Sequence, residues 1–169
     1  MNKMTRLILL ILVIGGNVGC DQVTKNVARE QLDYGSAISI IDPFLTLVKV
    51  ENTGAFLSLG NGLSESYRVG LLILVPSLIL ILVFVYAMRS NSISRYGIIG
   101  LGFIVGGGIG NMIDRILLGS VTDFLHMDFV LFRTGIFNAA DVSIMVGMFL
   151  LLFQSFFHRS DTKSVLTDN

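Results

Sequence analysis

The sequence contains little of the chemistry that stabilises many small proteins: no tryptophan, one cysteine and two histidines in 169 residues. Cys20 stands alone, so an intramolecular disulfide is excluded and a cysteine-based metal site cannot form. His126 and His158 lie in different segments and lack the spacing of metal ligands. We therefore expect no disulfide, no bound metal and no other cofactor.

Charged residues are scarce as well. They make up 14% of the chain, hydrophobic residues make up 53%, and the mean hydropathy is +0.76. This composition is far more apolar than that of a soluble domain and indicates an integral membrane protein surrounded by membrane lipid. Twelve basic and twelve acidic residues give no net charge, so nucleic acid is not an expected partner.

The predicted fold is an all-α polytopic membrane protein with a single integral membrane domain, residues 1–169. Apolar stretches long enough to cross a bilayer as helices occupy about residues 6–25, 67–88, 96–116 and 138–157. Pro76 interrupts the second stretch, which a membrane helix tolerates where neighbouring groups satisfy the freed carbonyl. The four stretches predict four transmembrane helices, and the polar residues 158–169 are predicted to form a disordered tail.

The first apolar stretch has a second interpretation as a cleaved leader. Basic residues precede an apolar run that ends in Val-Gly-Cys20, which is the layout of a secretory signal with a lipidation site. However, Asn17 occupies a position where such sites usually carry Leu, and three more apolar stretches follow. We therefore expect an uncleaved first helix in which Cys20 is a small apolar residue.

Residues 35–60 follow a different pattern. Apolar side chains are spaced mostly by twos around Thr and Lys, and Asn52-Thr53-Gly54 is typical of a turn. This pattern predicts a small antiparallel β-sheet outside the bilayer. The segment is longer than a simple connection between helices requires, so we expect it to form a docking surface.

Gly102, Gly106 and Gly110 recur every fourth residue along the third apolar stretch. Small residues at this spacing let helices approach closely, which predicts packing within the chain; a dimer interface is the alternative. We expect a monomer.

Basic residues indicate the orientation. On the side of both predicted termini they fall in about 25 residues of short flanks, whereas on the other side an equal number is spread over about 65. The higher density predicts cytoplasmic termini. The sheet and the notable carboxylates then lie on the extracytoplasmic face.

Carboxylates at the edge of a bilayer are costly and usually functional. The predicted outer face gathers four of them: Asp21, Asp114, Asp123 and Asp141. Asp21 has Lys25 one helical turn away and is expected to form an ion pair with it at the membrane surface. Asp114 adjoins Arg115 and is expected to be neutralised by it.

Asp123 and Asp141 lack such a cation, and two close acids that share one proton can act as general base and general acid. Each also has a structural interpretation. Asn138 and Asp141 have the spacing of a helix capping box, and Asp123 could lie in a turn or cap. Asn111 and Arg115, one turn apart on the preceding helix, favour a functional site because a cap does not need them.

Other functions fit less well. Ser58 and Ser66 do not belong to a serine–lysine dyad, and Asn111 replaces the aspartate that a presenilin-like GxGD motif requires. A small transporter or channel subunit would also place acids between helices, but near mid-membrane rather than at one face. That class is the alternative hypothesis.

The motifs resemble the bacterial lipoprotein signal peptidases, also called signal peptidase II or prolipoprotein signal peptidases. The resemblance rests on blocks in the family's order: DQVTK at Asp21–Lys25, NTGA at Asn52–Ala55, GGGIGNMIDR at Gly106–Arg115, VTDF at Val121–Phe124 and FNAADVSI at Phe137–Ile144. One departure is the single alanine before Phe56, where many members carry two.

The resemblance implies a metal-independent intramembrane aspartyl endopeptidase of the bacterial inner membrane. Its substrate would be a diacylglyceryl-modified prolipoprotein, cut just before the lipidated cysteine. Asp123 and Asp141 match the family's catalytic dyad. The resemblance also implies a set of residues that line or support the site: Asn52, Gly54, Asn111, Asp114, Arg115 and Asn138, with Asp21 and Lys25.

Overall fold

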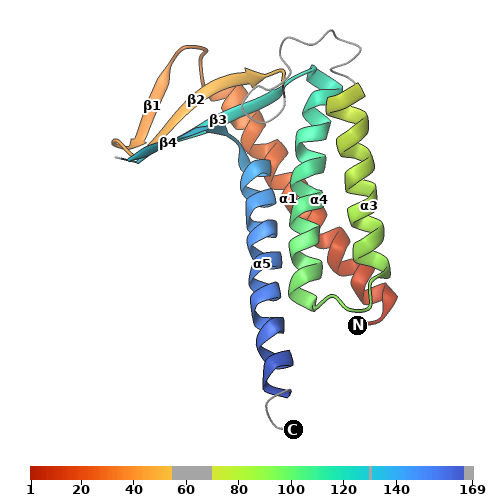
Figure 1. Ribbon diagram of the computed structural model, residues 1–169. Coiled ribbons are helices and arrows are strands. Elements are labelled where there is room, and N and C mark those ends of the chain that lie inside the picture. The colour runs from red at the N-terminus through yellow and green to blue at the C-terminus, as the bar shows by residue number, and fades with distance from the viewer. Residues whose placement is uncertain (55–69, 130, 166–169) are drawn as a thin grey trace.

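The computed structural model describes residues 1–54, 70–129 and 131–165, with side chains described as far as Ser155. Helices lie side by side, and a sheet covers one end of them (Figure 1). The N-terminus and the C-terminal end of the last helix lie at the opposite end. The elements in chain order are α1 (Lys3–Gln31), β1 (Ala37–Ile41), β2 (Leu45–Asn52), η2 (Gly70–Leu74), α3 (Val75–Arg89), α4 (Arg95–Leu118), β3 (Val121–Phe129), β4 (Phe132–Phe137) and α5 (Ala139–Val165).

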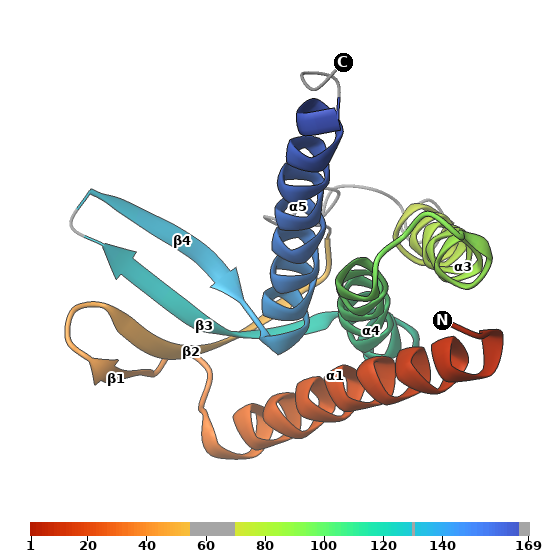
Figure 2. The ribbon, with the colours of Figure 1, turned by 90° about the horizontal axis from the view of Figure 1, so that it is seen from below.

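Helix α4 lies between α1, α3 and α5 (Figure 2). It contributes buried residues along its length, whereas the other helices expose large apolar side chains such as Leu12, Leu78 and Phe149. A helix surface of this kind is stable in lipid rather than in water. Among the described residues, α1, η2 with α3, and α4 are long and apolar enough to cross a membrane, and Ala139–Ser155 of α5 is a shorter apolar helix.

The helix boundaries differ in detail from the predicted spans. Helix α1 extends beyond residue 25 to Gln31, capped at its start by Asn2 Oδ1, which accepts the Thr5 N–H at 2.7 Å. Pro76 lies in the first turn of α3, directly after the π-helical turn η2, so its missing N–H falls at a helix start. Residues 67–69 of the second predicted span lie outside the described residues.

The last helix also differs from the prediction. The backbone of α5 is helical to Val165, beyond the predicted end of the fourth span at residue 157. The segment predicted as a disordered tail, residues 158–169, therefore begins as helix. Residues 166–169 are outside the described part of the chain.

The glycines of α4 pack against neighbouring helices of the same chain, as predicted. A Cβ atom added at Gly106 would lie 2.8 Å from the Asn17 Cβ of α1, and one at Gly102 would meet Val13. A Cβ atom added at Gly100 would lie 2.9 Å from the backbone carbonyl oxygen of Gly147 in α5. The glycine spacing thus brings α4 close to α1 on one side and to α5 on another.

The sheet is antiparallel with strand order β1-β2-β3-β4. Strands β1 and β2 come from the predicted β region, but β3 and β4 come from the connection between the third and fourth spans, which was not predicted to contain strands. The interpretation of Asp123 as a turn or cap residue is therefore wrong, because Asp123 lies within β3, opposite Val50. Residues 55–60 of the predicted β region lie outside the described residues.

The contact between α4 and α5 gives a first prediction. A Cβ atom at Gly147 would lie 2.5 Å from the Gly100 carbonyl oxygen and 2.7 Å from Ile104 Cγ1. Since the backbone cannot move aside, Gly147→Ala should lose about 1–3 kcal/mol of stability, seen as a lower melting temperature in detergent. The control is Gly15→Ala, because no described residue outside its own helix backbone lies within 4 Å of a Cβ atom added there. Its melting temperature should be unchanged or higher, and equal losses in both variants would contradict the packing.

Candidate active site

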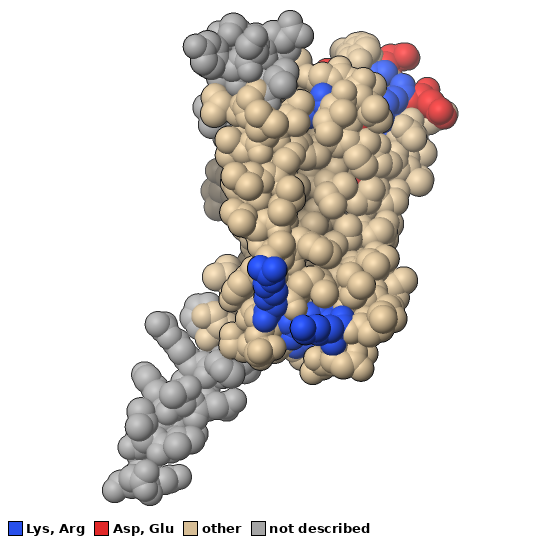
Figure 3. All heavy atoms as spheres, turned by 90° about the vertical axis from the view of Figure 1, so that its right-hand side faces the viewer, with Lys and Arg blue, Asp and Glu red and all other residues tan. Residues whose placement is uncertain are grey.

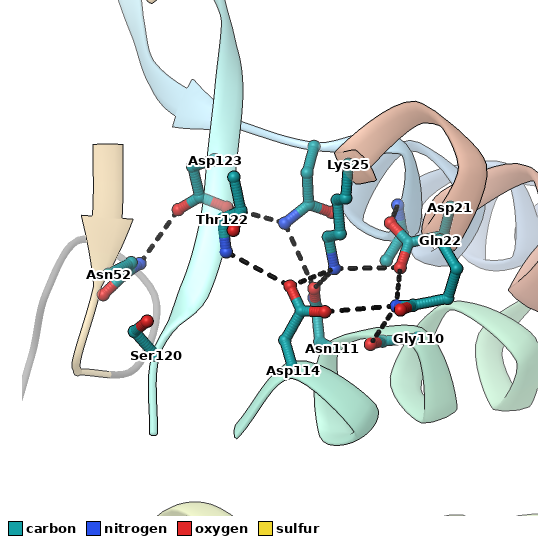
Figure 4. A network of polar contacts seen from close by, with 12 residues as sticks. Asp21, Gln22, Lys25, Asn52, Gly110, Asn111, Asp114, Ser120, Thr122 and Asp123 are labelled. Atoms are coloured by element: carbon teal, nitrogen blue, oxygen red, sulfur yellow. Dashed lines mark hydrogen bonds and ion pairs between the residues drawn. The ribbon is translucent and has the colours of Figure 1, made fainter. Parts of the chain in front are cut away.

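The candidate site lies where the sheet meets the helices, and several elements contribute to it (Figure 4). Asn52 ends β2, Asp123 lies near the start of β3, and Asn111 lies on α4. Asn138 and Asp141 are found at the start of α5, and Asp21 and Lys25 come from α1. Residues that are far apart in sequence thus meet at one end of the helix bundle.

Asp123 is held by two side-chain amides. Its Oδ2 accepts a hydrogen bond from Asn52 Nδ2 at 3.1 Å, and its Oδ1 accepts one from Asn138 Nδ2 at 2.6 Å. The residue is only 4% exposed. Burial raises the pKa of Asp123 from 3.8 to about 6, with the nearby charge of Asp141 acting in the same direction and the two amide hydrogen bonds opposing it.

Asp141 takes part in a capping box. Its Oδ2 accepts the backbone N–H of Asn138 at 3.1 Å, and Asn138 Oδ1 accepts the backbone N–H of Asp141 at 3.1 Å. Its other oxygen, Oδ1, accepts a hydrogen bond from Asn111 Nδ2 at 3.0 Å. The structural interpretation of this pair is therefore confirmed. It is compatible with a functional one, because Asn138 caps the helix with its oxygen while its amide nitrogen reaches Asp123.

Lys25 is completely buried beneath these residues. Its ammonium group pairs with Asp21 at 2.8 Å and with Asp114 at 3.2 Å, and donates to Asn111 Oδ1 at 2.9 Å. Because an ammonium group can only donate, it holds the amide oxygen of Asn111 on its own side and directs the amide nitrogen to Asp141. The predicted Asp21–Lys25 pair is confirmed, although it is buried and not at the surface.

The prediction that Arg115 neutralises Asp114 is wrong. Asp114 Oδ2 instead pairs with Arg29 at 2.8 Å and accepts the Thr122 N–H at 3.2 Å. Consecutive helical residues point in different directions, and Arg115 donates to the carbonyl oxygen of Gly54 at 3.3 Å, near enough to Asp141, Asp123 and Asp114 to interact with their charges. Gly54 in turn donates its N–H to Asn52 Oδ1 at 3.1 Å.

All the site residues implied by the sequence belong to this one network. Asp21 extends it to the start of α5, where its Oδ1 accepts the Ala140 N–H at 2.9 Å. Gln22, which was not predicted, donates to Asp21, to the Gly110 carbonyl and to Asp114. A Cβ atom at Gly110 would lie 2.5 Å from Asp21 Oδ2, so glycine makes room for this contact.

Further unpredicted residues fix the strands that carry Asn52 and Asp123. Glu51 accepts hydrogen bonds from Thr122 Oγ1 at 2.9 Å and from Ser120 Oγ at 2.6 Å. Arg29 Nε donates to Thr122 Oγ1 at 2.8 Å. The spacing of Asp21, Lys25 and Arg29 by fours was the signal that could have identified Arg29. The roles of Glu51 and Thr122 depend on the pairing of β2 with β3, which the sequence pattern did not reveal.

Together the fold and the site define a multi-pass membrane protein with a buried cluster of carboxylates, amides and cations at one end of its helices. A family model described as Signal peptidase (SPase) II matches residues 7–157, which contain every residue of the network described above. The chain belongs to this family.

Relatives named lipoprotein signal peptidase cover most of the chain. That of Aquifex aeolicus is 36% identical over 146 residues, which are 86% of this chain and 84% of the relative. That of Gloeothece citriformis is 37% identical over 164 residues, 96% of this chain and 97% of the relative. Two solved structures, described as bacterial membrane enzymes determined by the in meso method, are 25% identical. The first has a TM-score of 0.76, and the match covers 93% of this chain and 90% of that structure's chain. The second has a TM-score of 0.73, and the match covers 89% of this chain and 91% of that structure's chain.

The buried ion pairs give a second prediction. Lys25→Met leaves Asp21 and Asp114 buried without their shared ammonium group, so stability should fall by about 3–5 kcal/mol. The control is Arg133→Met, which breaks a pair with Asp128 in which Arg133 is 75% exposed; here about 0–1 kcal/mol is expected. Thermal unfolding in detergent compares the two, and equal losses would contradict the buried network.

Burial of Asp123 predicts a pH dependence of stability. Because its pKa is raised from 3.8 to about 6, the native state binds this proton more tightly than the unfolded chain. The stabilising contribution is complete below the unfolded pKa and is lost as the pH rises through about 6. Asp123→Asn cannot titrate, so its melting temperature should fall less than the parent's between about pH 4 and pH 6.

Asp128→Asn is the matched control, because it removes a carboxylate from the outer end of the same strand, away from Asp123; the flatter curve should be specific to Asp123→Asn. Parallel pH curves for Asp123→Asn and the parent would show that Asp123 titrates normally.

Proposed function

We propose that this protein is an aspartic signal peptidase that removes the signal peptide from diacylglyceryl-modified prolipoproteins. Family membership supports the reaction and the substrate class. The observation that carries the catalytic assignment is the unequal treatment of the four carboxylates. Asp21 and Asp114 form ion pairs with cations of α1, whereas Asp123 and Asp141 are bound by side-chain amides. Only the second pair remains available for proton transfer.

In the proposed mechanism, the dyad needs no metal and forms no covalent intermediate. The ionised member of Asp123 and Asp141 takes a proton from a water molecule, whose oxygen attacks the scissile carbonyl carbon while the protonated member hydrogen-bonds the carbonyl oxygen. The resulting tetrahedral intermediate collapses as the C–N bond breaks and the leaving amine receives a proton from the dyad. The raised pKa of Asp123, about 6, supports a pair that keeps one proton at a pH where an ordinary aspartate has lost it. The proton belongs to the pair as a whole.

We further propose that the protein crosses the bacterial inner membrane four times, with cytoplasmic termini and an extracytoplasmic site. The face shown in Figure 3 has Lys and Arg side chains at both ends and Asp and Glu near the sheet end. The end opposite the sheet, where α1 begins, α3 ends and α4 begins, thus shows basic residues without acidic ones. These basic residues are Lys3, Arg89 and Arg95. A basic end of this kind favours the cytoplasmic side. The lipid chains of the substrate would then remain in the outer leaflet beside the site.

The glycine contacts within the chain support a monomer, since α4 uses its small residues against α1 and α5. The position of the carboxylates at the sheet end of the bundle favours a protease over a transporter, whose acids are expected near mid-membrane.

The proposal predicts that Asp123→Asn and Asp141→Asn each lose at least about 100-fold of the cleavage rate. The assay incubates purified protein in lipid nanodiscs with a prolipoprotein that carries diacylglycerol on its cysteine. Asp128→Asn is the control from the same strand and should cleave at the parental rate, because Asp128 pairs with Arg133 away from the dyad.

A chelator should leave the rate unchanged, and the same prolipoprotein without diacylglycerol should be cut poorly. Cleavage that survives either substitution, or that requires a metal ion, would contradict the mechanism. Equal cleavage of lipidated and unlipidated prolipoprotein would contradict the substrate assignment.

A further inference from the structure

The end of the sheet farthest from the active site is apolar. Its residues, here called the outer tip, come from the β1–β2 and β3–β4 turns: Ile41, Phe44, Phe129, Leu131 and Phe132. The Asp128 N–H donates to the Phe44 carbonyl at 3.0 Å, which joins the two turns. The rings of Phe129 and Phe132 stack with their centroids 4.7 Å apart.

These side chains are strongly exposed. Leu131 is 94% exposed and Phe132 is 61% exposed. A single exposed apolar residue needs no explanation, but a contiguous group of large ones marks a surface that binds something. The outer tip does not belong to the active site, since Phe129 lies six positions after Asp123 on β3, or about 20 Å away at ~3.3 Å per residue.

The position of the outer tip indicates what covers it. The sheet reaches sideways beyond α1 and α5 instead of standing on top of the helices (Figure 2). The far ends of β3 and β4 lie at the level of the first turns of α5 (Figure 1). Those turns expose Val142, Met145 and Val146. The outer tip is therefore level with the start of the lipid-facing surface of the neighbouring helix.

Charged groups flank the outer tip on its strands. Asp128 and Arg133 form an ion pair at 2.7 Å directly behind the β3–β4 turn. Asp42, also exposed, lies in the β1–β2 turn itself, between Ile41 and Phe44. An apolar end with charged groups immediately behind it matches the boundary between lipid tails and headgroups. A surface built to pack against a second protein copy would not need to lie at this level.

We propose that the outer tip inserts into the bilayer leaflet on the sheet side and anchors the sheet there. Lipid tails cover Leu131 and the phenylalanine rings, while the Asp128–Arg133 pair stays among the headgroups. Because β3 carries Asp123 near its inner end, the anchor fixes the angle at which this strand leaves the active site over the leaflet. The inference concerns membrane contact and is independent of the catalytic assignment.

The absence of tryptophan makes a direct test possible, since any introduced tryptophan is the only one in the protein. Leu131→Trp and Phe132→Trp each place the reporter on the outer tip. Both parent side chains are exposed, so the larger indole ring can be accommodated without disturbing the fold. Leu78→Trp, on the exposed apolar surface of α3, is the reference for full burial in lipid. Tyr34→Trp is the matched control, because Tyr34 is an exposed aromatic residue of the same region at the other end of β1.

Each variant is reconstituted in liposomes with lipids brominated either near the headgroup end or near the methyl end of the acyl chains. For both outer-tip reporters we expect a blue-shifted emission and quenching that is stronger with bromine near the headgroups. Leu78→Trp should be quenched more by bromine near the chain ends, and Tyr34→Trp should be quenched by a water-soluble quencher only. Outer-tip emission that behaves like that of Tyr34→Trp would overturn the proposal. Blue-shifted emission that bromolipids leave unquenched, together with cross-linking between two copies, would assign the outer tip to a protein interface instead.

Discussion

The buried ammonium group of Lys25 is the interaction on which the rest of the site depends. It neutralises Asp21 and Asp114 where water does not reach and fixes the direction of the Asn111 amide. Such a cluster is stable only when complete, because removal of one partner leaves uncompensated buried charge. Its contacts also join α1 to α4, and Asp21 joins both to the start of α5 through the Ala140 N–H. The elements that carry Asp123 and Asp141 are thus held together by residues to which the proposed mechanism gives no chemical role.

Two residues at the start of α5, Asn138 and Asp141, serve two purposes with different atoms of their side chains. Asn138 and Asp141 satisfy each other's backbone N–H groups, as an ordinary capping box does. The remaining atoms of the two side chains face Asp123 and Asn111. The cap therefore also positions Asp123 and Asp141, so its structural role is compatible with the catalytic role that we propose for them.

The sequence was sufficient for the helices and for most of the site. Apolar length predicted the helical segments, and spacing by four predicted the Asp21–Lys25 pair and the close packing of Gly102, Gly106 and Gly110. Strands β3 and β4 were missed because their residues follow a helix directly and look like a connecting loop. The contacts of Glu51 and Thr122 were missed for the same reason, because they depend on the pairing of β2 with β3. The partner of Asp114 was mistaken because sequence adjacency says little about which side chains face each other.

The central claim is that Asp123 and Asp141 hold a single proton between them up to about pH 6, well above the usual range of an aspartate. Infrared titration of the protein measures this most directly, since a protonated carboxyl group has a carbonyl stretch that an ionised one lacks. The account predicts a protonated band that persists above pH 3.8, disappears around pH 6, and is absent from the Asp123→Asn variant. A titration in which parent and variant are identical, with no band lost on substitution, would contradict the claim.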